Sequence, residues 1–417
     1  MRQPQEDRIA QLRELKPKVL CLGVYIWNHQ ATLDLLTIWR TLEPQCKIVL
    51  GGPEVSYLPP EHELIRLADV VVKGEGDTAL GPLLGELLET ETQVKGETRL
   101  VQGGQPRLEA LDWPYSLYSQ EDLDHKLTYV ESSRGCPFGC EFCLSSLDNR
   151  VRDFPLESFL EEMESLIRRG GHQFKFIDRT FNLKLDRAQA IMEFWLKRLK
   201  TGMYVHFELV PDRLPPELRD LIRRFPPGSL RLEVGLQTYD PDTALRINRR
   251  QDYSLTQENM RFLREETQAL VHADLIVGLP GEGLESFARG FDELWLNRPG
   301  EVQVGILKKL PGAPIARHDQ PWGMKYDENP PYEVLETSVL PLGEMNRLKH
   351  FAKFWELIVN RGKMEPQVAR LLPPSQGAFE RFDSLSRHLY SELGRTWAIP
   401  LDDLRQKTDE YLDLKGL

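Results

Sequence analysis

The stretch Ser133-Arg-Gly-Cys-Pro-Phe-Gly-Cys-Glu-Phe-Cys143 places three cysteines, Cys136, Cys140 and Cys143, within eight residues. The spacing C-x3-C-x2-C is one thiolate short of the four that close a structural zinc or iron–sulfur site. Three thiolates on a four-iron cluster leave one iron free for an outside ligand, and the two glycines of the stretch let the backbone pass close to a cluster. The stretch therefore predicts a cluster with an open, reactive iron.

Two other uses of these cysteines stay open. A zinc ion would need a fourth ligand, which His125, Asp148 or His172 is available to supply, but zinc loops usually come as two short cysteine pairs and no second pair exists here. A disulfide is disfavoured by the odd total of 5 cysteines and by a start that lacks a secretory signal. Cys21, in the apolar run 19–24, is expected to be a small buried side chain.

Length and composition limit the class of protein. A chain of 417 residues exceeds one ordinary core, and 41% hydrophobic with 28% charged residues is typical of a soluble globular protein of two or three domains. The net charge of −11 argues against a nucleic-acid partner, because a broad nucleic-acid surface needs a basic face. Because no apolar stretch has the length of a membrane span, no membrane partner is expected. The reducing cytoplasm is the expected location.

The first part of the chain alternates short apolar strands with helical patterns. Strands are expected at 19–24, 47–50 and 69–72, with helices at 32–42, 60–67 and 78–88. Such alternation predicts a parallel α/β sheet over residues 1–95, with functional loops at the carboxyl ends of its strands. Residues 96–126 lose this periodicity and are expected to be a linker.

A longer alternation begins at Leu127. Strands are expected at 127–133, 173–178, 204–209, 230–236, 271–277 and 301–307. Helices are expected at 156–169, 185–200, 215–224, 255–268 and 284–296. Six βα units predict a partial (β/α)6 barrel over residues 127–320, with its functional loops at one rim. Residues 321–417, which carry no metal or nucleophile motif, are expected to form a helical cap.

Polar residues interrupt the apolar strands of the predicted barrel. Glu208, Gln237 and Asp274 lie at or near strand ends, where a buried carboxylate or amide costs several kcal/mol unless it is paired. Arg249, in Ile-Asn-Arg-Arg-Gln, is suited to a charge-assisted pair with a ligand carboxylate. Rim carboxylates often pair only with arginine, so each residue alone is ambiguous, and the set along the strands is what indicates a ligand.

Taken in their order along the chain, these pieces resemble the radical S-adenosylmethionine (radical SAM) superfamily, and among it enzymes related to the oxygen-independent coproporphyrinogen oxidases. The resemblance implies a [4Fe–4S] cluster on Cys136, Cys140 and Cys143, whose open iron binds the amino and carboxylate groups of SAM. The implied SAM-binding residues are Phe142, Glu208, Gln237, Arg249, Asp274 and the turn Gly278, Pro280 and Gly281. Lys309–Pro314 resembles the loop beside adenine.

Asp178, at the end of the second barrel strand, stands where this family often has Gly-Gly-Glu. The resemblance makes it a candidate acceptor for the amino group of SAM. A solvent-facing ion pair with Arg179 is the alternative. The side chains that would recognise the substrate, Glu131, Arg179, His206 and Arg231, are too general in type to name it.

The first region resembles the cobalamin-binding domain that precedes many radical SAM cores, through Gly51, Gly52, Gly74 and Gly76. Two departures limit what this implies. The chain has no Asp-x-His-x-x-Gly, the motif whose histidine binds cobalt, and His29 and His62 read as surface residues. Residues 5–16 already resemble the second helix of that domain, so a truncated domain is expected.

The expected function is reductive cleavage of SAM to a 5′-deoxyadenosyl radical that abstracts hydrogen from a small-molecule substrate. With cobalamin as a further cofactor, the enzyme would be a C-methyltransferase. Electrons would come from an external flavodoxin or ferredoxin. A cobalamin-independent hydrogen-abstracting enzyme, a methylthiotransferase acting on tRNA and a non-catalytic iron–sulfur protein are the alternatives. The methylthiotransferase needs a further cysteine trio that the first region lacks.

Overall fold

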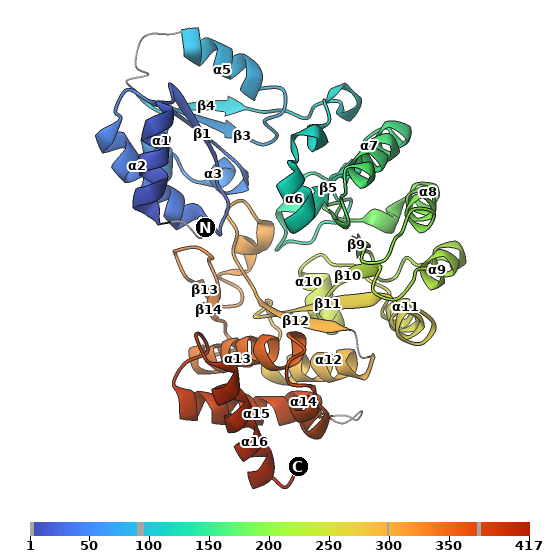
Figure 1. Ribbon diagram of the computed structural model, residues 1–417. Helices are drawn as coiled ribbons and strands as arrows, with labels where there is room; N and C mark the ends of the chain where they lie inside the picture. Colours follow the sequence, from blue (N-terminus) through green and yellow to red (C-terminus); the bar gives the residue numbers. More distant parts are fainter. Residues whose placement is uncertain (1–3, 90–95, 298–299, 373–376) are drawn as a thin grey trace. The chain divides into compact units, whose positions relative to one another are not determined.

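The computed structural model describes residues 4–89, 96–297, 300–372 and 377–417, and Figure 1 shows their path. The chain divides into two compact units. The front unit comprises residues 1–112 together with the later segments 308–314 and 327–333. The barrel unit comprises residues 113–307, 315–326 and 334–417. The front unit is therefore completed by residues from beyond the barrel strands.

The front unit is built on a parallel sheet of four strands in the order β1-β2-β3-β4. Its strands are β1 (Val19–Gly23), β2 (Lys47–Gly51), β3 (Val70–Lys73) and β4 (Arg99–Gln102). Its helices are α1 (Gln5–Leu15), α2 (His29–Leu42), α3 (Pro53–Tyr57), α4 (Glu63–Leu67) and α5 (Leu80–Glu89).

Both faces of this sheet are covered, as its apolar strands require. On one face, Ile48 and Leu50 of β2 pack with Trp39 of α2 in the larger core. On the other face, Val49 and Val72 pack with leucines of α5. The alternation along β2 explains this arrangement, because successive side chains of a strand point to opposite faces.

Two expectations for this region are wrong. Part of the expected linker 96–126 belongs to the sheet, since β4 pairs with β3 through residues such as Leu100 opposite Val71. β4 is largely exposed and has only two apolar residues, Leu100 and Val101, so it lacks the apolar pattern that reveals the other strands. Cys21 is exposed rather than buried, because β1 lies at the other edge of the sheet.

The barrel unit contains six parallel strands in the order β12-β11-β10-β9-β8-β5. They are β5 (Thr128–Val130), β8 (Gln173–Phe176), β9 (Tyr204–Leu209), β10 (Leu230–Gln237), β11 (Leu270–Val277) and β12 (Glu301–Ile306). Sequential order with open first and last strands is that of a partial barrel, as the sequence predicts. The pair β6 (Ser133–Arg134) and β7 (Arg152–Asp153) brackets the cysteine stretch.

The helices of the barrel unit are interspersed with its strands along the chain, and most of them lie along the outside of the sheet in Figure 1. They are α6 (Gln120–His125), α7 (Leu156–Arg168), α8 (Leu185–Leu196), α9 (Pro216–Arg223), α10 (Pro241–Arg246), α11 (Tyr253–Glu266) and α12 (Leu284–Asn297). Residues Phe174, Phe207 and Leu232 point from the strands toward this helical layer and are fully buried. The alternate positions face the lumen of the barrel, among them Glu208 and Glu233.

The last part of the chain is mainly helical, with a short hairpin before it. The hairpin is β13 (Lys325–Tyr326) with β14 (Val334–Glu336), and the helices are α13 (Leu342–Trp355), α14 (Glu365–Leu371), α15 (Ala378–Leu393) and α16 (Leu401–Leu414). Phe351 and Trp355 of α13 meet Phe291 of α12 edge to face, with ring centroids 5.1 and 4.7 Å apart. An aromatic core thus fixes the helical region to the last barrel helix.

Candidate active site

The cysteine stretch leaves the barrel after β5 and forms a loop at the carboxyl ends of the strands. Its beginning is held by the backbone N–H of Cys136, which donates to the carbonyl of Asp148 at 3.0 Å. Its end is a turn in which the N–H of Cys143 donates to the carbonyl of Cys140 at 3.1 Å. Gly135 has a φ of +93°, which favours glycine.

All three thiols line one cavity of about 250 Å³. Burial raises the pKa of the Cys136 and Cys140 thiols. The free energy of cluster binding must therefore offset the cost of deprotonating them. Within the described ranges, no three His, Cys, Asp or Glu side chains converge closely enough to hold a single metal ion.

The cavity also collects the polar residues that the sequence singles out on the barrel strands. Those predicted residues that line it are Phe142, Glu208, Gln237, Arg249 and Asp274. They come from the cysteine loop, from the ends of β9 and β10, from the turn before α11 and from the middle of β11. Residues far apart in the sequence thus share one cavity, and their assignment to SAM stays a prediction.

Two of the lining carboxyl groups titrate near neutrality. Burial raises the pKa of Glu208 to about 7, against the effect of Arg179, whose Nη1 lies 3.2 Å from Oε1 of Glu208. Burial, with Glu233 and Glu208 nearby, raises the pKa of Asp274 to about 7 as well. Carboxyl groups with such shifts gather at functional sites.

Arg249 lies against the cysteine loop. Its Nη1 is 3.5 Å from Sγ of Cys140, and its other terminal nitrogen donates to the carbonyl of Gly235. The neighbouring Gln237 has a φ of +72° beside an irregularity in the pairing of β10 with β11. A non-glycine residue in this conformation is strained, and such strain is found preferentially where a side chain must face a ligand.

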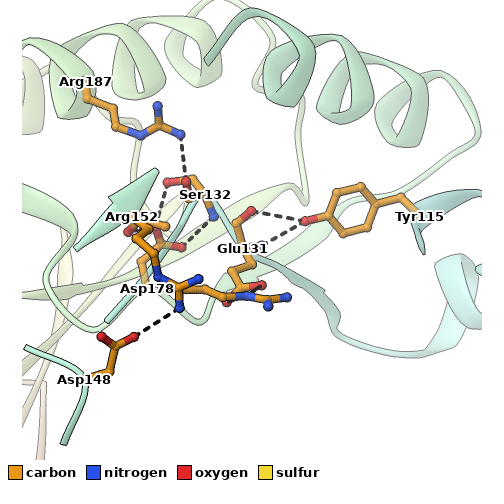
Figure 2. A network of polar contacts seen from close by, with 9 residues as sticks. Tyr115, Glu131, Ser132, Asp148, Arg152, Asp178 and Arg187 are labelled. Atoms are coloured by element: carbon orange, nitrogen blue, oxygen red, sulfur yellow. Dashed lines mark hydrogen bonds and ion pairs between the residues drawn. The ribbon is translucent and has the colours of Figure 1, made fainter. Parts of the chain in front are cut away.

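Asp178 does not line the cavity, contrary to the sequence-based expectation. The side chain is 1% exposed, and its carboxylate accepts from the N–H and hydroxyl of Ser132 at 2.9 and 2.6 Å and from the hydroxyl of Ser133 at 2.7 Å. Figure 2 shows this network, in which Arg187 also donates to the carbonyl of Ser132. Because β5 and β8 are paired neighbours, Asp178 fastens the start of the cysteine loop instead.

The turn Gly278, Pro280 and Gly281 also lies away from the cavity lining. A Cβ at Gly278 would stand 2.5 Å from Val334, and the carbonyl of Pro280 accepts from Arg246 at 2.6 Å. The turn therefore packs against neighbouring segments of the barrel unit. Residues 308–314, which include the whole of the expected adenine-side loop, are part of the front unit.

Glu233 also lines the cavity, although it is not among the residues predicted from the sequence. It faces the lumen two positions before Gly235, where Lys175 donates to it at 2.9 Å and His206 lies 3.2 Å away. The bond from His206, with that from Lys175, lowers the pKa of Glu233 to about 2. Because side chains of a strand alternate between its two faces, the sequence of β10 already places Glu233 on the same face as Gln237. Of the four expected substrate-recognising residues, Arg179 lines the cavity.

The front unit presents its own loops at the carboxyl ends of β1, β2 and β3. Trp27 is 76% exposed and stacks on Tyr25 with ring centroids 4.4 Å apart. A Cβ at Gly74 would meet nothing within 4 Å, so the backbone there is open to a ligand. Gly52, with a φ of +102°, is instead required by the fold, because a Cβ would stand 2.5 Å from the carbonyl of Val24. An exposed aromatic pair beside open backbone fits a large flat ligand.

The histidines of the front unit are engaged with other residues, and His29 is buried rather than on the surface. Its Nδ1 lies 2.7 Å from Oε1 of Glu54, which is 1% exposed and also accepts from the hydroxyl of Tyr332. Nδ1 of His62 accepts from the N–H of Leu64 at 3.2 Å. The Nδ1 atoms of both histidines are therefore engaged within the front unit.

Comparison with protein families places a known domain on each part of the chain. Residues 130–294 match the radical SAM superfamily, residues 1–84 match the B12 binding domain, and residues 320–398 match a family of unknown function, DUF4080. In the described parts of the chain, no helix combines the length and apolar character that a bilayer crossing requires.

Two curated relatives are methyltransferases. The cobalamin-dependent radical SAM methyltransferase TokK of Streptomyces tokunonensis is 26% identical over 337 residues, which are 72% of this chain and 48% of TokK. The 2-(S-pantetheinyl)-carbapenam-3-carboxylate methyltransferase of Streptantibioticus cattleyicolor is 27% identical over 339 residues, again 72% of this chain and 48% of the relative. The chain thus spans about half the length of these curated relatives.

A solved structure shares the fold. The radical SAM methyltransferase TsrM of Kitasatospora setae, determined with cobalamin and a [4Fe–4S] cluster bound, superposes with a TM-score of 0.60. The two chains are 19% identical, and the match covers 82% of this chain and 77% of TsrM. At this identity the likeness concerns the architecture of an α/β front unit followed by a partial barrel.

Proposed function

The chain is a member of the radical SAM superfamily, and from this premise we propose that it binds a [4Fe–4S] cluster and cleaves SAM reductively. We propose further that the front unit binds cobalamin and that the net reaction is C-methylation of a small-molecule substrate. One observation carries the proposal most directly. The three cysteines line the same cavity as Glu208, Gln237, Arg249 and Asp274.

Each group of residues has a part in this chemistry. The thiolates of Cys136, Cys140 and Cys143 would hold three irons, and Arg249, beside Cys140, would pair with the SAM carboxylate near the fourth. Glu208 and Asp274 would accept hydrogen bonds from the ribose hydroxyls. When bound, the cluster with SAM supplies a 5′-deoxyadenosyl radical, and cobalamin supplies a methyl carrier. The apolar wall of Leu209, Val210 and Pro211 would limit the access of water to the cavity.

For cobalamin, the support is the match to the B12 binding domain together with the open loops of the front unit. Gly51, Gly52, Gly74 and Gly76 lie on the loops at the carboxyl ends of β2 and β3, where ligands of parallel sheets bind. The cytoplasmic location and the external flavodoxin or ferredoxin donor are further parts of the proposal, each open to its own test.

The test is anaerobic reconstitution of the full chain with iron and sulfide, followed by incubation with SAM and dithionite. The expected products are equal amounts of 5′-deoxyadenosine and methionine. A cluster that forms without any cleavage of SAM would contradict the enzymatic proposal and favour a non-catalytic iron–sulfur protein. Purification with and without added cobalamin, followed by absorption spectra, tests the second part. A protein that retains no corrinoid but cleaves SAM would be a hydrogen-abstracting enzyme without methyl transfer.

A further inference from the structure

Glu141 stands between the second and third cysteines, and its side chain is buried by residues from beyond the last barrel strand. The residue is 7% exposed. Arg317 approaches the carboxylate in bidentate fashion, with Nε 2.7 Å from Oε2 and Nη2 2.5 Å from Oε1. Nε2 of His318 lies 2.8 Å from the same Oε2. A buried carboxylate is thus held by two side chains of one turn, Pro314–His318.

The backbone of the loop is fastened at the same place. The N–H of Glu141 donates to the carbonyl of Ile247 at 3.1 Å, and its carbonyl accepts from the N–H of Ile315 at 2.9 Å. The amide of Asn248 donates to the carbonyl of Gly139 at 3.0 Å. A Cβ at Gly139 would collide with this amide, so the close approach requires glycine. Asn248 itself has a φ of +55°, a strained conformation that these contacts hold in place.

Inside the loop, by contrast, the backbone is weakly self-supporting. Between Cys136 and Cys143, the described backbone bonds that stay within the loop reduce to the turn from Cys143 to Cys140. The positions of the three thiols therefore depend on contacts from outside the loop. The largest group of these contacts converges on Glu141, between the thiols of Cys140 and Cys143.

We propose that Glu141, with Arg317 and His318, is a positioning clamp that holds the three thiols in the arrangement a [4Fe–4S] cluster needs. This inference rests on the proposed function, since it concerns the cluster expected there. The clamp also reaches the SAM side of the cavity, because Arg317 donates to the carbonyl of Arg246 at 3.3 Å. Ile247 and Asn248 follow at once, and Arg249, beside Cys140, ends this short segment. One ion pair thus fixes both the thiols and the arginine next to them.

The test compares full-length holoproteins that differ in this ion pair. Arg317→Gln removes the bidentate partner, Glu141→Gln removes the charge while keeping the size, and the double variant leaves no unpaired charge from either residue. Arg223→Gln is the matched control, because it breaks an Arg–Glu pair of 2.5 Å between α9 and α11, outside the cysteine loop. Iron and sulfide per chain are measured after reconstitution, and the loss of cluster absorbance is followed after addition of an iron chelator.

We expect the Arg317→Gln cluster to be lost at least about tenfold faster than that of wild type, because charge-assisted hydrogen bonds to a buried carboxylate are broken. The increase in the rate of cluster loss in the double variant should be smaller than the product of the increases in the two single variants. Both changes break the same interaction, so their effects should not multiply. The electron paramagnetic resonance change that SAM produces in the reduced cluster should be weakened in the variants. Arg223→Gln should match wild type in all three measurements.

The outcomes separate this inference from the function on which it rests. A wild-type protein that takes up no cluster contradicts the proposed function. A wild-type protein that takes up the cluster, with Arg317→Gln and Glu141→Gln indistinguishable from Arg223→Gln, contradicts the clamp alone. Circular dichroism of the cluster-free proteins reports whether each variant is folded. If Arg317→Gln does not fold, the double variant decides in its place, because it removes the ion pair without leaving Glu141 charged.

Discussion

The three thiols of the cavity are nonequivalent in their surroundings. Cys140 is 8% exposed and lies beside Arg249, whereas Cys136 and Cys143 are half-buried. A cationic neighbour favours the thiolate that a metal requires, in opposition to the effect of burial. Cys140 is therefore the thiol whose ligand role depends most on its neighbours in the fold.

Replacing Cys140 by alanine should abolish both the cluster and the formation of 5′-deoxyadenosine. Two thiolates cannot hold a four-iron cluster with one open iron, so iron content and SAM cleavage should fall together. Cys21→Ala is the control, because Cys21 is exposed on the edge strand β1 of the front unit. SAM cleavage at the wild-type rate by Cys140→Ala would refute the assignment of the cluster.

The affinity for SAM should rise with pH through neutrality. Glu208 and Asp274 have pKa values of about 7, so both are largely protonated at pH 6 and ionised at pH 8. On the proposed assignment, the ionised groups would attract the sulfonium and accept hydrogen bonds from the ribose hydroxyls. One carboxyl group that must ionise weakens binding about tenfold for each pH unit well below its pKa.

The measurement is equilibrium binding of SAM to the unreduced, cluster-loaded protein across this pH range. Glu208→Gln should bind SAM less tightly at pH 8 and show a shallower pH dependence. Asp274→Asn should behave in the same way. An affinity that is the same at pH 6 and pH 8 in the wild-type protein would rule out the ionisation of either residue as a requirement.

At the scale of elements, the alternation of the barrel strands explains most of the site. On β10, Leu232 and Val234 face the helices, while Glu233 and Gly235 face the lumen. Barrel interiors are usually filled by branched apolar side chains. Charged residues at these positions mark a lumen that serves ligands and ion pairs instead of packing. The pattern is visible in the sequence because a strand has a period of two.

Helix α15 carries a buried ion pair that fixes the helical region. Asp383 is fully buried and accepts from Arg347 of α13 at 2.7 and 2.5 Å and from Arg387 at 2.9 Å. The side chains of Arg347 and Arg387 are 30% and 58% exposed, so loss of Asp383 costs mainly the three charge-assisted hydrogen bonds that its buried carboxylate accepts. The pair joins two helices whose aromatic residues pack together, so ionic and apolar contacts support each other there.

Asp383→Ala should lower the free energy of unfolding of the barrel unit by about 3 kcal/mol, because three charge-assisted hydrogen bonds are lost. Urea unfolding followed by tryptophan fluorescence measures this change. Asp402→Ala is the control, since Asp402 is 94% exposed and its ion pair with Arg405 spans 3.6 Å. It should change the same free energy by less than about 0.5 kcal/mol. Equal effects of the two substitutions would argue against a structural role for the buried pair.

At the scale of the whole molecule, the front unit is completed by residues that lie beyond the barrel strands. Tyr332, from segment 327–333, reaches Glu54 at the start of α3, next to the Gly51-Gly52 turn. Segment 308–314 contributes Gly312, where a Cβ would collide with the ring of Tyr57. The N–H of Lys309 donates to the carbonyl of Tyr332 at 3.0 Å, which links the two segments. The loops expected to hold cobalamin therefore depend on a distant part of the chain.

Tyr332→Phe should destabilise the region around α3 by about 1–2 kcal/mol, because Glu54 loses a hydrogen bond in a buried site. Hydrogen exchange of residues 47–58, followed by mass spectrometry, should become faster. Tyr129→Phe is the control, since Tyr129 is 51% exposed and lies in the barrel unit. Unchanged protection of residues 47–58 in Tyr332→Phe would mean that the returning segment does not support these loops.

The sequence by itself determined the cysteine spacing, the six barrel strands and the polar positions along them. These features are local, because a motif, a strand or an alternation can be recognised within a few residues. For the same reason Glu208, Gln237, Arg249 and Asp274 could be selected, and the structure places all four on the cavity of the three cysteines.

Only the tertiary structure decided which partner each polar group has. The sequence made Asp178 a candidate ligand, but the pairing of β5 with β8 brings its carboxylate into hydrogen-bonding contact with Ser132. Glu141 and Arg317, which bind each other, are separated by 176 residues. Hydrogen bonds and burial depend on neighbours brought together by folding, and no local pattern encodes such a neighbour. The cysteine stretch predicts the cofactor, whereas contacts from residues distant in the sequence determine how the thiols are held.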